Sequence, residues 1–145
     1  MGDLTALNNN QTFATLWVNL LMISQRDLAE IIGSEITGVG INPASVSIEF
    51  SRGCRDSGSG WILIQCGFSL QHSEGESIGN GSSPQSSTCL HRCVHKIVVD
   101  ANFDEHKVLT LVLDSDLIVR VVPELDGLES YVLHTSQGIV PIIAV

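Results

Sequence analysis

The feature that most constrains this chain is a run of apolar residues at every second position, which occurs twice. Successive side chains of a β-strand point to opposite faces, so this period predicts strands with one buried face. Polar residues such as Ser47, Glu49 and Thr110 fill the intervening positions. The clearest runs are Val46, Ile48 and Phe50 in the first half and Leu109, Leu111 and Leu113 in the second. The sequence therefore predicts a mainly antiparallel β-sheet.

The spacing ahead of each run is shared as well. The same intervals separate two sets of apolar residues: Ile32, Ile36, Val39, Ile41 and Leu90, Val94, Ile97, Val99. This doubling predicts two half-repeats, about residues 32–70 and 90–143, within a single domain that covers residues 1–145. A three-stranded meander cannot bury its apolar face alone. We therefore expect the two copies to pack face to face or to join in one twisted sheet.

Helices are expected ahead of the first half-repeat. Ser24 can cap the free amides of a first helical turn, and the apolar residues that follow it fall on one helical face. Gly33 is placed to end this helix, which we expect over about residues 25–32. An apolar segment at residues 12–22 predicts an earlier helix. Together with the strands, these elements predict an α+β fold.

Residues 71–88 interrupt the hydrophobic pattern between the two halves. The segment is polar and rich in glycine and serine. Such a composition is typical of an unburied linker. We expect this segment to be the boundary between the half-repeats.

The chain is strongly acidic. It has 16 Asp and Glu residues against 7 Lys and Arg residues, which gives a formal net charge of −9 over 145 residues. A negative surface repels phosphate backbones, so this charge disfavours nucleic-acid binding and favours a basic protein partner. The hydrophobic fraction of 43% and the charged fraction of 16% argue against a disordered chain.

The N-terminal segment is interpreted as part of the folded protein rather than as a targeting signal. The apolar run at residues 13–23 is too short to cross a bilayer, and no basic residue precedes it. We therefore expect a cytoplasmic protein without membrane association. In that reducing compartment we expect the cysteines to be free thiols. They are Cys54, Cys66, Cys89 and Cys93.

The order of the expected elements carries a resemblance. A short helix and a glycine are followed by a strand pair, a polar linker and a second meander that ends in GLESYVL at residues 127–133. Over about residues 28–143 the chain resembles a group of small bacterial proteins with two half-repeats, some of them similar to toxin-neutralising immunity proteins. It departs from them at residues 114–116, where they often have an Asp-Gly turn. Four residues fit the group's ending: Glu129, Tyr131, Leu133 and Gly138.

The resemblance implies a non-enzymatic binding protein that blocks a cognate toxin, and it supplies neither a catalytic residue nor a cofactor. Carboxylates in the loops of the second half are expected to stay solvated and ionised, where they would attract a basic toxin domain. The expected partner-binding residues are Glu124, Asp126, Glu129 and Tyr131.

Two other functions stay open on the sequence alone. One is a small metal-dependent or hydrolytic enzyme that uses a row of ligand types favoured by zinc, although the ends of such a row on a strand lie too far apart for one ion. The row is Cys89, His91, Cys93 and His95. The other is a structural, self-associating protein. Residues 13–23 would form its apolar contact if they are not absorbed into the core, for instance in a homodimer.

Overall fold

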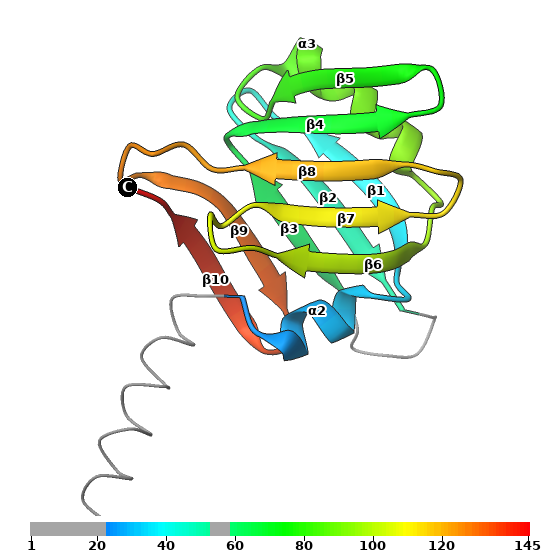
Figure 1. The fold of residues 1–145 in the computed structure, drawn as a ribbon, viewed down its shortest axis with the longest axis horizontal. Coiled ribbons are helices and arrows are strands. Elements are labelled where there is room, and N and C mark those ends of the chain that lie inside the picture. The colour runs from blue at the N-terminus through cyan, green and yellow to red at the C-terminus, as the bar shows by residue number, and fades with distance from the viewer. Residues whose placement is uncertain (1–22, 53–58) are drawn as a thin grey trace, which may run out of the picture.

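The alternating residues form two antiparallel sheets that pack face to face, with short helices at their edges (Figure 1). This is a computed structural model, and it describes residues 23–52 and 59–145. The expected α+β fold is confirmed, with two sheets rather than one. The helices are α2 (Gln25–Ile31), α3 (Pro84–Ser87) and the 3₁₀ helix η1 (Thr88–Cys93). Within the described ranges, no helix is long and apolar enough to cross a membrane.

Each sheet has five strands. In spatial order, the first sheet contains β1 (Glu35–Ile41), β2 (Val46–Ser51), β3 (Gly60–Ile64), β9 (Glu129–Thr135) and β10 (Gly138–Ile143). The second sheet contains β5 (Gly75–Asn80), β4 (Gly67–His72), β8 (Ile118–Val122), β7 (Leu109–Leu113) and β6 (Val98–Phe103). Neighbouring strands pair antiparallel throughout both sheets.

The two halves of the chain exchange hairpins. The first half places its meander β1–β3 in the first sheet and its hairpin β4–β5 in the second sheet. The second half places β6–β8 in the second sheet and β9–β10 in the first sheet. The order of either sheet is therefore obtained from the other when the two halves are interchanged. Each sheet is joined at its centre by a pairing between the halves, β3 with β9 and β4 with β8.

The core between the sheets follows the period of two. The six residues of the two predicted runs are each at most 3% exposed: Val46, Ile48, Phe50, Leu109, Leu111 and Leu113. They belong to one continuous cluster of buried side chains that includes residues of both sheets. The alternation therefore predicted correctly which face of these strands is buried.

The prediction that residues 71–88 form an unburied linker is wrong. This segment completes β4, forms β5 and α3, and leads into η1. The polar composition is compatible with structure because strand pairing satisfies the backbone, while the serine hydroxyls bond to nearby carbonyls. Ser87 Oγ, for example, donates to Asn80 O at 3.1 Å and to Ser83 O at 3.0 Å.

Gly81 allows the chain to cross from the first sheet to the second sheet at residues 65–66. Residues 65 and 66 alone connect β3 to β4. Gly81 N donates to Cys66 O at 2.9 Å, and a Cβ atom on Gly81 would overlap the carbonyl of Ile64. Only a residue without a side chain fits this close approach of two backbones.

The expected helix at residues 25–32 is confirmed as α2. Ser24 and Asp27 form a reciprocal capping box, and Asp27 is 2% exposed. Its Oδ1 also accepts a hydrogen bond of 2.6 Å from Thr135 Oγ1, so α2 is tied to the β9–β10 turn. The helix expected at residues 12–22 lies outside the described residues, and Ile23, which follows it, is buried in the core.

Replacement of Thr135 by valine tests this tie. Valine keeps the shape of threonine but leaves a buried oxygen of Asp27 without its donor and Gln137 N without its acceptor, so we expect a loss of about 1–3 kcal/mol in the free energy of unfolding. Urea denaturation measures it. The matched control is Thr88→Val, because the Thr88 hydroxyl bonds to a carbonyl at an exposed site. Equal stabilities of the two variants would show that the Asp27–Thr135 bond does not hold the helix.

Candidate binding surfaces

The connection between β8 and β9 is a fixed loop at residues 123–128. It lies at one end of the sandwich, beside the end of β10 (Figure 1). Gly127 N donates to Ala144 O at 2.8 Å, and Leu128 N donates to Asp126 Oδ1 at 2.9 Å. Gly127 has a φ of +75°, a left-handed conformation that favours glycine. A backbone hydrogen bond therefore holds the loop to Ala144, the residue that follows β10.

This loop presents apolar side chains to solvent. Leu125 is 76% exposed and Leu128 is 67% exposed. Leu125 lines a shallow pocket of about 180 Å³ together with Glu105, His106, Lys107, Ala144 and Val145. We call residues 123–129 together with Glu105 and Val145 the loop surface.

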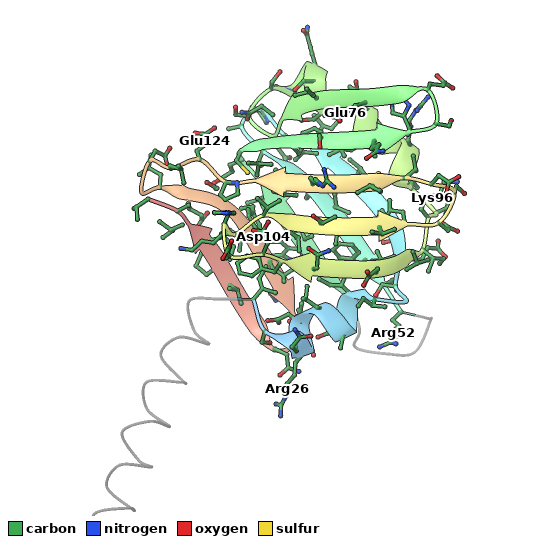
Figure 2. The ribbon with its side chains drawn as sticks, in the orientation of Figure 1. Arg26, Arg52, Glu76, Lys96, Asp104 and Glu124 are labelled. Carbon is green, nitrogen blue, oxygen red and sulfur yellow. The ribbon has the colours of Figure 1, made fainter. Side chains whose placement is uncertain are left out.

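Carboxylates surround these leucines. Three of the expected partner-binding residues, Glu124, Asp126 and Glu129, are exposed on the loop surface. Figure 2 shows Glu124 and Asp104 toward the same end of the sandwich, with Lys96 at the opposite end. One cation, Lys107, lies nearby, and its ammonium donates to Ile143 O at 2.6 Å. The loop surface is therefore negative around an apolar centre.

The prediction that Tyr131 is a contact residue is wrong. Its side chain is fully buried, and its hydroxyl donates to Lys107 O at 2.7 Å. Burial raises the pKa of Tyr131 above its ordinary value, and electrostatic interactions with Cys66 and Asp104 raise it further. On β9, a strand with both faces largely buried, the Tyr131 side chain points into the core and its hydroxyl holds the β6–β7 loop.

The structure disperses the Cys–His row. Cys93 is fully buried in η1, while the side chain of His95 is exposed and its Nδ1 lies 3.2 Å from Glu35 Oε2. Cys89 is half-buried and its Sγ donates to Ser86 O at 3.4 Å. Burial raises the pKa of Cys93 to about 12, which disfavours the thiolate that a metal needs. In the part of the chain that the structure describes, no group of three or more His, Cys, Asp or Glu side chains is arranged to hold a metal ion.

A serine and a histidine meet in the β4–β5 hairpin. Ser77 Oγ lies 3.1 Å from His72 Nε2, the geometry of a nucleophile and its base. The other ring nitrogen, Nδ1, is buried and has no hydrogen-bond partner among the described residues. The orienting acid of a catalytic triad is thus absent from this pair as described.

Sequence reasoning missed a pocket on the outer face of the first sheet. The rings of Trp61 and His134 stack with their centroids 4.9 Å apart and their planes at 19°. The pocket has a volume of about 310 Å³, and its lining residues are Thr37, Glu49, Phe50, Ser51, Ser59, Gly60, Trp61 and His134. The sequence places Trp61 on a predicted strand, but its stacking partner comes from the other half of the chain. The local pattern contains no signal for that pairing.

Comparison of the chain with protein-family models, curated proteins and solved structures finds no match. The expected resemblance to immunity proteins gains no support from these comparisons.

The burial of the cysteines predicts their reactivity. In a Cys54→Ser background at pH 8, we expect Ellman's reagent to modify half-buried Cys89 faster than Cys66 and Cys93, which should react only as fast as the protein unfolds. The cause is that Cys66 and Cys93 are buried and burial raises the pKa of each thiol to about 12. Three similar rates measured at 412 nm would contradict this expectation.

The same shifts give a dependence of stability on pH. The folded state retains thiol protons that the unfolded chain releases near pH 9. The contribution of these thiols to stability is therefore complete below that pH and is lost as the pH rises toward 12.

Proposed function

We propose that this protein is a non-enzymatic cytoplasmic binding protein whose loop surface docks a basic protein, in the way that an immunity protein blocks a cognate toxin. The observation that carries the proposal is the exposure of Leu125 and Leu128 on a loop fixed by hydrogen bonds. An apolar centre with a charged rim is the usual arrangement of a protein interface.

The leucines supply the affinity in this proposal. Burial of Leu125 and Leu128 against a partner would stabilise the complex by about 1.5–3 kcal/mol for each side chain. The bonds of Gly127 and Leu128 already order the loop in the free protein. Little conformational entropy is then lost on binding, which favours a tight complex.

The carboxylates supply the selection of a basic partner. Glu124, Asp126 and Glu129 carry like charges around the leucines, on a chain with a net charge of −9. Such a field accelerates association with a basic surface and disfavours acidic proteins. A cytoplasmic encounter is supported by Cys66, Cys89 and Cys93, which are all free thiols.

The double variant Leu125→Asp/Leu128→Asp tests the loop surface. The matched control is Ile78→Asp, because Ile78 is 77% exposed on β5, away from the loop. A partner is first captured from lysate with the unmodified protein, identified, and purified. We expect the double variant to weaken binding to that partner about a hundredfold or more, and the control to bind normally, as measured by calorimetry.

Two outcomes would contradict the proposal. One is equal binding of the partner by the double variant and by Ile78→Asp. The other is a partner that is acidic. Blocking is tested with the same proteins: if the partner alone arrests growth of its host, the unmodified protein and Ile78→Asp should restore growth, and the double variant should not.

The charges are tested separately with Glu124→Gln/Asp126→Asn/Glu129→Gln. The asparagine keeps the side-chain oxygen that accepts the bond from Leu128 N. We expect a slower association rate with a weaker dependence on salt, while the dissociation rate changes little. Stopped-flow mixing at several salt concentrations measures this. An association rate equal to that of the unmodified protein would rule out electrostatic steering by this loop.

A further inference from the structure

The pocket on the first sheet is built along one row of paired residues. Across the strands, Gly38 pairs with Glu49, Glu49 pairs with Trp61, and Trp61 pairs with His134. Paired residues point to the same face of a sheet. The row therefore places a glycine, a carboxylate and two aromatic rings side by side on the outer face.

The carboxylate and the indole form opposite sides of the pocket. A Cβ atom on Gly38 would lie 3.0 Å from Glu49 Oε2, so the side chain of Glu49 extends over β1, away from Trp61. On the other side, the imidazole of His134 stacks on the indole and supports it. Both Glu49 and Trp61 line the space between them.

The described residues that line the pocket carry a negative charge. Among the lining residues, Glu49 is the acid and there is no lysine or arginine. Among the described residues, Arg52 is the basic residue nearest in sequence to the pocket lining. Its guanidinium lies toward Gly33 at the end of α2, where a Cβ atom on Gly33 would be 3.5 Å from it. The pocket thus offers an aromatic face and a carboxylate to a ligand from outside.

We propose that this pocket binds the side chain of an arginine presented by another protein. A guanidinium is planar and positively charged, so it stacks on an indole through the cation–π interaction and through its flat face. Its N–H groups also match a carboxylate. Lysine lacks the flat face, and a neutral ring lacks the charge that Glu49 attracts. The pocket is separate from the loop surface, so this inference does not depend on the function proposed there.

The test uses three short peptides: acetyl-Gly-Arg-Gly-amide and its counterparts with lysine and with citrulline, the neutral analogue of arginine. Each is titrated at millimolar concentration into the ¹⁵N-labelled full chain, and the indole N–H resonance of Trp61 is followed. Trp17→Phe assigns that resonance. We expect a saturable shift with the arginine peptide, and affinities at least about fivefold lower with the lysine and citrulline peptides, the factor that about 1 kcal/mol provides.

Two variants assign the charge effect. Glu49→Gln should weaken binding of the arginine peptide by up to about fivefold, the upper end of the range of an exposed charge pair. Glu76→Gln is the matched control, because Glu76 is an exposed acid on β5 of the second sheet (Figure 2) and does not line the pocket. Leu125→Asp/Leu128→Asp should leave the titration unchanged, which separates this site from the loop surface.

Three results would overturn the inference. The first is a Trp61 resonance that does not move with the arginine peptide. The second is equal affinity for the arginine and citrulline peptides, or equal effects of Glu49→Gln and Glu76→Gln. The third is a saturable shift with a neutral sugar such as methyl glucoside but not with the arginine peptide.

Discussion

The pairing of strands from opposite halves of the chain is the constraint on which the structure depends. Ile62 of β3 pairs with Leu133 of β9, and Leu70 of β4 pairs with Val119 of β8. All four of these side chains are fully buried. Without these two pairings, each half would keep a three-stranded meander and a separate hairpin whose apolar faces stay in water. Such units are marginal at best alone, so we expect the halves to fold together.

The exchange of hairpins also explains where the loop surface lies. The chain crosses from one sheet to the other at two equivalent places, after β3 and after β8. The first crossing takes residues 65–66, whereas the second takes residues 123–128. The additional residues of the second crossing carry Leu125 and Leu128. The acidic, apolar surface thus lies at one of the points at which the two halves differ.

The pocket on the outer face of the first sheet also depends on the exchange of hairpins between the halves. Trp61 and His134 stack because β3 and β9 are adjacent in the first sheet, although they lie far apart in the sequence. Beside these rings, the absence of a side chain on Gly38 leaves room for the Glu49 side chain over β1. The pocket therefore rests on contacts between strands, whereas the loop surface consists mainly of one continuous segment, residues 123–129, which hydrogen bonds hold in place.

Alternation of polar and apolar residues was enough to predict the strands around residues 46–50 and 109–113 and the buried face of each, because that pattern is local. Capping residues were likewise enough to predict α2. The sequence alone also determined the negative charge and the exposed acids of residues 124–129. Only the tertiary structure decided that residues 71–88 form a hairpin, that Tyr131 turns inward, and that Trp61 meets His134. These outcomes depend on which strands become neighbours, and the energy that selects neighbours comes from burial between distant segments, which no local pattern records.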